Sequence, residues 1–209
     1  MSLDREQQAL ASRLHAGEEE RPDVSRIVTA IEPSVFTVEA GAMQGSGWIV
    51  RSGPAGSDLV TNFHVVRTIW DRGGRTVSLV QDGNARSGTI TDIDQLRGLA
   101  LVHIAATLPA LTVAKARAEI GDPVVVFGTP LGLSDTVTTG VVSAYRTEEG
   151  TDFLQFSAPM SPGSSGGPVV DHDGTVLGVT TSKITEQNSE GLSFAVTSDE
   201  ICRAFELDC

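Results

Sequence analysis

A serine enclosed by glycines is the first feature of the sequence that could do chemistry. Ser165 lies in the segment PGSSGGP, residues 162–168. Glycines allow a tight turn in which the backbone approaches a substrate closely, and the N–H groups of Gly163 and Ser165 can then point to one spot. Two converging N–H groups form an oxyanion hole, which stabilises the charge that develops in acyl transfer. Taken alone, the segment also fits an ordinary Gly/Ser turn.

A histidine at the end of an apolar strand could supply the base that such a serine needs. His64 lies in the segment VTNFHVV, residues 60–66, directly after polar Thr61 and Asn62. A lone histidine in this setting is more often a satisfied core residue. Together with the glycine-flanked serine it becomes a candidate general base, because an imidazole can take the hydroxyl proton as the oxygen attacks.

Short β-branched segments separated by turns must position these two residues. From residue 34 onward about a dozen such segments, among them SGWIV, LVTNF, DPVVVFG and LSFAV, recur at roughly ten-residue spacing. Asp82-Gly83 and Asp173-Gly174 are strong hairpin signals. The chain has 22 glycines and only 5% aromatic residues, which also favours many tight turns. The pattern predicts an all-β fold built as a sandwich or as barrels, followed by a short C-terminal helix over residues 197–207.

The first 22 residues differ in composition from the rest of the chain. They are polar and rich in Gln, Glu and Arg, so we expect a surface helix or a disordered leader over 1–22 and a folded domain over 23–209. Pro22-Asp23 predicts the start of a short helix with Ile27 and Ile31 on one face. The N-terminus shows no basic cluster followed by an apolar stretch, so no signal peptide is expected.

Several of these segments together resemble the chymotrypsin-fold (trypsin-like) serine proteases of the HtrA/Deg type. SGWIV, TNFHVV, FGTPLGL, TGVVSA, PGSSGGPVV and GLSFAV follow one another in the order found in that family. The resemblance covers about residues 23–200. It implies two six-stranded antiparallel β-barrels with the active site between them, the first at about 23–110 and the second at about 120–196.

The resemblance also implies a role for each motif residue. Ser165 would be the nucleophile, and His64 would take its proton and return it to the leaving amine. The backbone N–H groups of Gly163 and Ser165 would hold the oxyanion. The implied activity is that of a serine endopeptidase acting on protein substrates by acyl transfer, with no cofactor and no metal.

Two further segments concern the substrate. The resemblance implies that a protein or peptide substrate lies as an extended strand against Thr180, Thr181 and Ser182, held by main-chain hydrogen bonds. Met160 lies just before the serine turn, where this fold places the primary specificity pocket. No acidic residue stands there to bind Lys or Arg, so we expect a small or medium apolar side chain before the cleaved bond.

One position departs from the family pattern. The family opens a strand with Asp-Leu-Ala, whereas this sequence has Gly98 followed by Leu99 and Ala100. In serine proteases this aspartate holds the histidine tautomer and stabilises the imidazolium, and its loss costs about 10⁴ in turnover, or about 5.5 kcal/mol.

Three hypotheses follow from Gly98. Asp94, or else Asp92, could supply the carboxylate from a few residues upstream. A water or a backbone carbonyl could orient His64 in a weaker dyad. The chain could instead be a protease-fold module that binds peptides or proteins without turnover. A protease held inactive until a partner or cleavage reorders its loops is a further alternative, with residues 67–75 and the leader as candidates for control.

Other classes of function find little support in the sequence. The formal net charge of −12 argues against a nucleic-acid partner, and no apolar run is long enough to span a membrane. His172 lies in a hairpin turn without further ligands at fixed spacing, and His103 lies on an apolar strand, so neither predicts a metal site. The GTPLG segment (128–132) lacks the lysine of a phosphate loop, which argues against a nucleotide site.

The two cysteines, Cys202 and Cys209, lie close to the C-terminus and form no CxxC pair. We expect two free thiols. A disulfide is the alternative, and it would require an oxidising compartment and a bend, because positions seven apart on a straight helix lie about 10 Å apart. The family resemblance leans toward an extracytoplasmic (periplasmic or secreted) bacterial protein.

Overall fold

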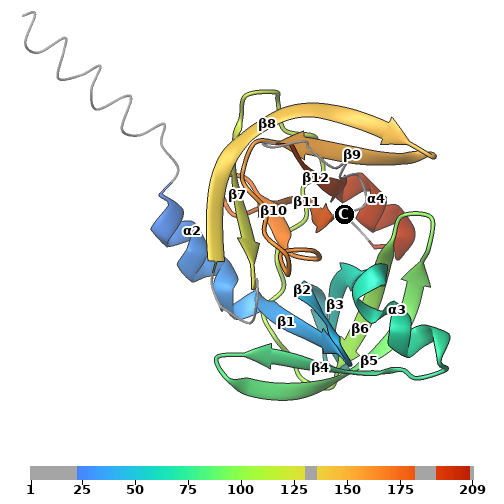
Figure 1. The fold of residues 1–209 in the computed structure, drawn as a ribbon. Helices are drawn as coiled ribbons and strands as arrows, with labels where there is room; N and C mark the ends of the chain where they lie inside the picture. The colour runs from blue at the N-terminus through green and yellow to red at the C-terminus, as the bar shows by residue number, and fades with distance from the viewer. Residues whose placement is uncertain (1–22, 130–135, 182–191, 208–209) are drawn as a thin grey trace, which may run out of the picture.

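The computed structural model describes residues 23–129, 136–181 and 192–207. Its strands form two closed six-stranded antiparallel barrels, which lie one above the other in Figure 1. The all-β, two-barrel fold expected from the sequence is therefore confirmed. Residues 130–135, which include most of the FGTPLGL segment, lie outside the described residues.

The first barrel closes in the order β1-β2-β3-β6-β5-β4. Its strands are β1 (Val35–Ala40), β2 (Met43–Gly53), β3 (Gly56–Asn62), β4 (Thr76–Gln81), β5 (Asn84–Asp94) and β6 (Leu99–Ile104). Asp82 and Gly83 form the turn between β4 and β5, as their hairpin signal predicts. Inside lies an apolar cluster that includes Phe36, Ile49 and Val102.

The second barrel closes in the order β10-β11-β12-β9-β8-β7. Its strands are β7 (Pro123–Gly128), β8 (Thr136–Glu148), β9 (Thr151–Phe156), β10 (Pro168–Val170), β11 (Val176–Thr181) and β12 (Ser193–Thr197). A second apolar cluster, which includes Leu154 and Val169, lies inside this barrel. A third, which includes Trp48, Phe127 and Val179, takes residues from both barrels and joins them into one unit.

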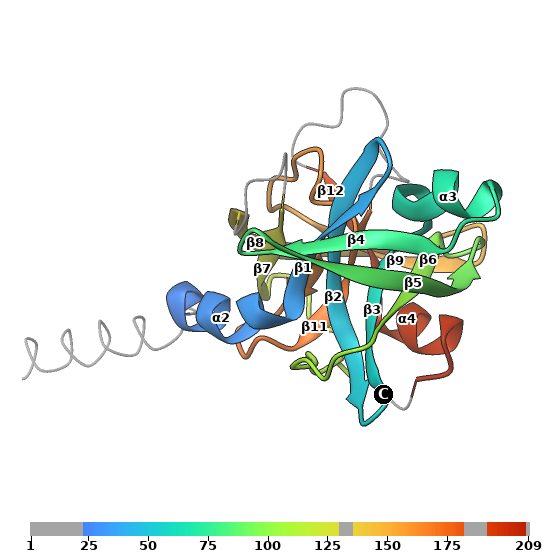
Figure 2. The same cartoon turned by 90° about the horizontal axis from the view of Figure 1, so that it is seen from below.

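Four short helical segments accompany the barrels in the described part of the chain. Two of them, α2 (Val24–Ile31) and the 3₁₀ turn η1 (Glu32–Ser34), lead into β1 (Figure 2). The Asp23 side chain caps α2 by accepting from Arg26 N at 3.1 Å, and Ile27 and Ile31 are buried, as expected. The C-terminal helix α4 (Ser198–Ala204) is likewise present.

The sequence reading missed one helix, α3 (Phe63–Asp71), which begins where the strand β3 ends. Val65 and Val66 are buried in its first turn, and Ile69 and Trp70 pack on the same cluster one turn later. That three- and four-residue spacing is the helical signal, but the β-branched pair Val65-Val66 resembles the end of a strand. Within the described ranges, no helix is both long enough and apolar enough to cross a membrane.

Candidate active site

The serine turn, residues 161–167, connects β9 to β10 and touches the first barrel. Ser46 N in β2 donates a hydrogen bond of 2.8 Å to Ser165 O. Gly166 has φ +93°, and a Cβ on it would lie 2.0 Å from Ser46 O, so only glycine permits this approach. The turn therefore depends on contact between backbone atoms of the two barrels.

The two N–H groups expected to form the oxyanion hole are available. Within the described residues, neither Gly163 N nor Ser165 N donates a hydrogen bond. Neighbouring amides of the turn are bonded, as Ser164 N donates to Ser161 O at 3.0 Å and Gly167 N to Ser164 O at 3.0 Å. Gly166 N donates to Thr180 O of β11 at 2.9 Å, so the amides of Gly163 and Ser165 differ from these neighbours in having no described acceptor.

His64 is the second residue of α3 and is partly buried. Burial lowers the pKa of His64 below its ordinary value of 6.5, because the imidazolium is desolvated. Its imidazole makes no hydrogen bond to any residue that the structure describes. Burial therefore favours the neutral imidazole, and no described residue occupies the lone pair that would accept a proton.

A glycine of β2 brings the histidine helix and the serine turn to one place. A Cβ on Gly45 would lie 2.9 Å from Ser165 O and 2.6 Å from Cγ2 of Val65, which follows His64 in the sequence. The serine turn of one barrel and the first turn of α3 on the other thus flank the same glycine. The structure therefore places the backbone of Ser165 close to the segment that carries His64.

The position of the missing aspartate is fixed by the backbone. Gly98 closes the turn between β5 and β6 with φ +69°, a left-handed conformation. Its carbonyl accepts from Phe63 N at 2.8 Å, so the turn touches the start of the histidine helix. Gly98 provides no side chain with which to bind His64.

The two upstream carboxylates bind other groups. Asp94 accepts from Arg97 N at 2.8 Å on one oxygen and from Arg97 Nη1 at 2.7 Å on the other. Asp92 is exposed and accepts from Ile93 N at 2.8 Å. Neither aspartate is paired with His64 among the described residues.

Arg97 extends this cluster to the far end of the chain. Its Nε donates to Glu200 of α4 at 2.5 Å, and Arg203 donates to the other Glu200 oxygen at 2.7 Å. The Glu200 side chain is only 2% exposed, which makes its two cationic partners necessary. Hydrogen bonds to Asp94 and then to Glu200 raise the pKa of Arg97. Sequence reasoning missed this cluster because 103 residues separate Arg97 from Glu200.

The residues expected to bind substrate lie in different settings. Thr180 is buried beneath the serine turn and exchanges backbone hydrogen bonds of 2.9 Å with Gly166 and Gly167. Thr181 is buried on β11 opposite Phe194 of β12. Ser182 lies outside the described residues. Met160 is half-buried and packs against the apolar cluster inside the second barrel.

Ser46 is a residue of the site that the sequence reading did not single out. It is fully buried in β2, and its hydroxyl donates to Gly163 O at 2.8 Å. The same oxygen accepts from Thr129 N at 2.9 Å, and Thr61 Oγ1 donates to Ser46 O at 2.7 Å. The available signal was a polar residue between two glycines at the start of an apolar strand, which is a weak one.

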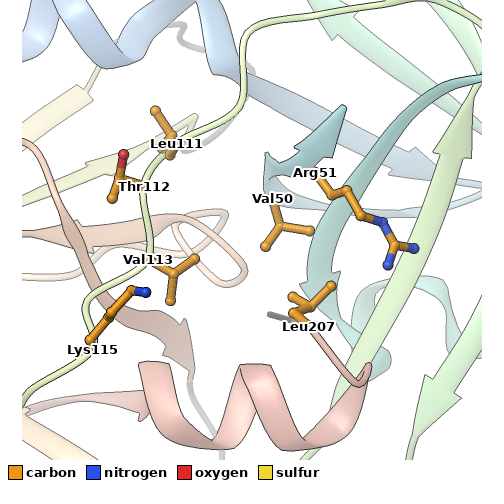
Figure 3. Close-up of a pocket in the computed structure, with 7 residues that line it drawn as sticks. All are labelled: Val50, Arg51, Leu111, Thr112, Val113, Lys115 and Leu207. Carbon is orange, nitrogen blue, oxygen red and sulfur yellow. The ribbon is translucent and has the colours of Figure 1, made fainter. Parts of the chain in front are cut away.

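A cavity of about 400 Å³ lies between the first barrel, the linker that follows it and the C-terminal segment (Figure 3). Val50 and Arg51 of β2 form one wall, the linker 111–115 forms the other, and Leu207 lies beneath them. None of the candidate catalytic residues lines it. The cavity is therefore not where peptide-bond chemistry would take place.

The described histidines other than His64 each lie beside an aspartate. His103 Nδ1 lies 2.9 Å from Asp58 Oδ1, and His172 pairs with Asp173 in an exposed turn. No group of three or more metal-ligating side chains occurs in the described part of the chain.

The expectation of free thiols is wrong, because Cys202 is disulfide-bonded. The other cysteine in the sequence, Cys209, lies outside the described residues.

Comparison with known proteins agrees with this geometry. The Trypsin-like peptidase domain family matches residues 45–179. Serine protease HTRA3 of Rattus norvegicus is 36% identical over 195 residues, covering 87% of this chain and 41% of that protein. A probable periplasmic serine endoprotease, DegP-like, of Chlamydia muridarum is 37% identical over 165 residues, covering 75% of this chain and 32% of that protein.

Solved structures show the same fold. The active form of the Rv3671c protease of M. tuberculosis superposes with a TM-score of 0.74 at 25% identity, covering 86% of this chain and 82% of that one. The serine endoprotease of Yersinia pestis gives a TM-score of 0.74 at 28% identity, over 87% and 65%. The chain spans about two-fifths of the length of its HTRA3 relative. It belongs to the trypsin-like peptidase family, with HtrA/Deg serine proteases among its relatives.

Proposed function

We propose that this protein is a serine endopeptidase that cleaves protein substrates by acyl transfer from Ser165. The observation that carries the proposal is the pair of free N–H groups, Gly163 and Ser165, in a turn docked beside the helix that bears a neutral His64. Donors left unpaired in this way are arranged for a charge that appears only during reaction.

The reaction takes place in two halves. Ser165 Oγ attacks the carbonyl carbon of the substrate while His64 accepts the hydroxyl proton, and the oxyanion is held by the N–H groups of Gly163 and Ser165. The C–N bond then breaks as His64 returns the proton to the leaving amine, which leaves an acyl-serine. A water molecule attacks this ester by the same route and releases the acid and the free Ser165 hydroxyl.

We infer that His64 and Ser165 act as a dyad. Gly98 offers no carboxylate, and both oxygens of Asp94 accept hydrogen bonds from Arg97. To reach His64, Asp94 would have to give up charge-assisted bonds to a guanidinium, which are among the stronger hydrogen bonds in proteins. A dyad still benefits from the oxyanion hole and from substrate binding, at a lower turnover than a triad.

The proposed substrate is a peptide segment bound as an extended strand, with a small or medium apolar side chain before the cleaved bond. Supporting this preference, Met160 and its apolar neighbours lie next to the serine turn. An extracytoplasmic location is also proposed. It is supported by the disulfide at Cys202, because disulfides persist in oxidising compartments, and by the periplasmic DegP-like relative.

Labelling with a fluorophosphonate probe tests the proposal directly. We expect the wild type to react at Ser165, and Ser165→Ala to show no labelling. His64→Ala should react at least about 10³-fold more slowly, because the base is lost. Ser164→Ala is a matched control, since Ser164 is the buried neighbour in the same turn and its labelling should stay near wild type.

Gly98 favours a second candidate function, that of a protease-fold module that binds peptides without cleaving them. In that case the wild type would label no faster than Ser165→Ala, while extended peptides would still bind. Equal labelling of the two proteins therefore rejects the endopeptidase proposal.

A further inference from the structure

The hydroxyl of Ser46 lies at the centre of a set of hydrogen bonds that crosses between the barrels. It donates to Gly163 O at 2.8 Å and accepts from Thr129 N at 2.9 Å, and Thr129 Oγ1 lies 3.2 Å away. The backbone N–H of the same residue donates to Ser165 O at 2.8 Å. One buried residue of the first barrel thus binds two carbonyls of the serine turn.

These two carbonyls determine how the turn presents its free amides. The N–H and the carbonyl of Gly163 are separated only by its Cα. A hydrogen bond that fixes the carbonyl therefore restricts rotation about the two backbone bonds at that Cα. A glycine has no Cβ to restrict that rotation itself. Since Gly163 N donates to no described residue, the Ser46 hydroxyl is the contact that orients this residue from the other barrel.

The first barrel also holds Ser46 firmly. Thr61 Oγ1 donates to Ser46 O at 2.7 Å, and Thr61 is fully buried three residues before His64. A Cβ on the neighbouring Gly45 would collide with both Ser165 O and Val65. Through β2, the serine turn is therefore held in a defined position relative to β3 and to α3, the helix that carries His64.

We propose that Ser46 is a positioning residue that holds the oxyanion-hole amides of Gly163 and Ser165 in register with His64. The inference rests on the proposed endopeptidase function for its catalytic consequence. Its structural part, an ordered serine turn, does not depend on activity. Without the Ser46 hydroxyl, the Gly163 carbonyl loses its donor and Thr129 N loses its acceptor. Among the described residues, the Gly163–Ser164 peptide plane then keeps its bond within the turn, from Ser164 N to Ser161 O, but has no hydrogen bond to the first barrel.

Ser46→Ala tests this inference, with Ser57→Ala as the matched control. The Ser57 hydroxyl is also buried in the first barrel, donates to Ala106 O at 2.8 Å and accepts from Leu108 N at 2.9 Å. Ser57 pairs with Ser52, which lies six residues beyond Ser46 on β2, so it is about 20 Å from the serine turn. Each variant loses one donated bond, one accepted bond and one bond to another hydroxyl, that of Thr129 for Ser46 and that of Ser52 for Ser57. A loss of stability alone would therefore affect both.

Two measurements distinguish positioning from stability. Hydrogen exchange of the peptide covering residues 161–167 should become about tenfold faster in Ser46→Ala and stay unchanged in Ser57→Ala. With a peptide substrate, kcat should fall about 10- to 100-fold in Ser46→Ala while KM changes less than threefold, because a small displacement of the amides affects only the transition state. Affinity for a peptide boronate should fall with kcat.

Each result leads to a conclusion. Unchanged exchange in Ser46→Ala overturns the proposal, and faster exchange with an unchanged kcat overturns the catalytic role of Ser46. Equal effects in both serine variants would show that Ser46 is merely structural. If the wild type proves inactive, the endopeptidase proposal fails, and the exchange data alone decide whether Ser46 orders the turn.

Discussion

The serine turn and the Gly98 turn are both held by hydrogen bonds to other elements, but only the serine turn offers groups that the proposed reaction needs. The serine turn is tied to the first barrel by Ser46 and leaves two amides free. The Gly98 turn is tied to α4 through Arg97 and Glu200, yet it offers no group to His64. A turn can therefore be held rigidly without offering groups for the reaction. Both turns are held in this way, but they differ in the groups that they offer.

The comparison explains the electrostatics of His64. A buried imidazole with no carboxylate beside it has a lowered pKa, because desolvation acts on it alone. In a complete triad the aspartate would favour the imidazolium and oppose this effect. In the proposed mechanism, Ser165 and the amides of Gly163 and Ser165 supply the nucleophile and the oxyanion hole, while His64 lacks an orienting carboxylate at residue 98.

Restoring the carboxylate should have the largest effect. We expect Gly98→Asp to raise kcat about 10²- to 10⁴-fold, because an aspartate there would fix the tautomer of His64 and stabilise its charged form. The left-handed backbone, φ +69°, costs the substitution about 1 kcal/mol of stability, although Asp is tolerated there better than most residues.

Gly98→Asn is the control for this gain. Asparagine has the same size and tolerates the same backbone, but it cannot stabilise an imidazolium by charge. Steady-state kinetics of the two variants should therefore diverge strongly. A Gly98→Asp protein no faster than Gly98→Asn would show that residue 98 does not face His64.

Removing the ion pair between Arg97 and Glu200, which ties the Gly98 turn to α4, should have the next largest effect, and that effect is on stability. Arg97→Met leaves Glu200, 2% exposed, with only Arg203 as a partner. We expect the free energy of unfolding in urea to fall by about 2–4 kcal/mol, because a buried charge loses part of its compensation.

Arg51→Met provides the comparison for this loss. Arg51 forms an ion pair with Asp58 of similar length, but its side chain is 53% exposed. Exposed pairs contribute at most about 1 kcal/mol, so this variant should unfold close to wild type. Equal losses in the two variants would mean that the burial of Glu200 does not matter to the fold.

Local patterns allowed an all-β fold to be predicted, and the resemblance of contiguous motifs to a known family allowed the two barrels to be predicted and His64 and Ser165 to be proposed as site residues. Strand alternation and Asp-Gly turns are read over a few residues, and the motifs around His64 and Ser165 are contiguous. Ser46 and Arg97 were missed because each acts on a partner about a hundred residues away. Such contacts follow from barrel closure, which no short segment of the sequence encodes. Helix α3 was missed because its β-branched start continues the preceding strand in composition.

The pH dependence of activity should show a smaller effect of the missing carboxylate. The reaction needs neutral His64, so kcat/KM rises as pH increases through its pKa and then levels off. Because burial lowers this pKa, the half-maximal point should lie below pH 6.5. In Gly98→Asp the new charge favours the imidazolium, so the same limb should move to higher pH. An acidic limb above pH 7 in the wild type would indicate a carboxylate beside His64.

The smallest effect is expected for Asp94→Asn. If His64 works without a carboxylate, this change should alter kcat less than threefold, and the acidic limb of the pH profile should stay in place. Stability should fall modestly, because Arg97 keeps Glu200 while losing the charge of Asp94. Peptide kinetics and urea unfolding of the same preparation measure the two effects separately.

A loss of more than about 10²-fold in Asp94→Asn would reverse the comparison between the two turns. It would mean that Asp94 leaves Arg97 when substrate binds, and that the Gly98 turn carries the third catalytic group after all. Arg97→Met would then release Asp94 and should raise kcat at the cost of stability. In a true dyad Arg97→Met lowers stability and leaves kcat unchanged. The two substitutions therefore give opposite patterns under the two mechanisms, and together they decide between them.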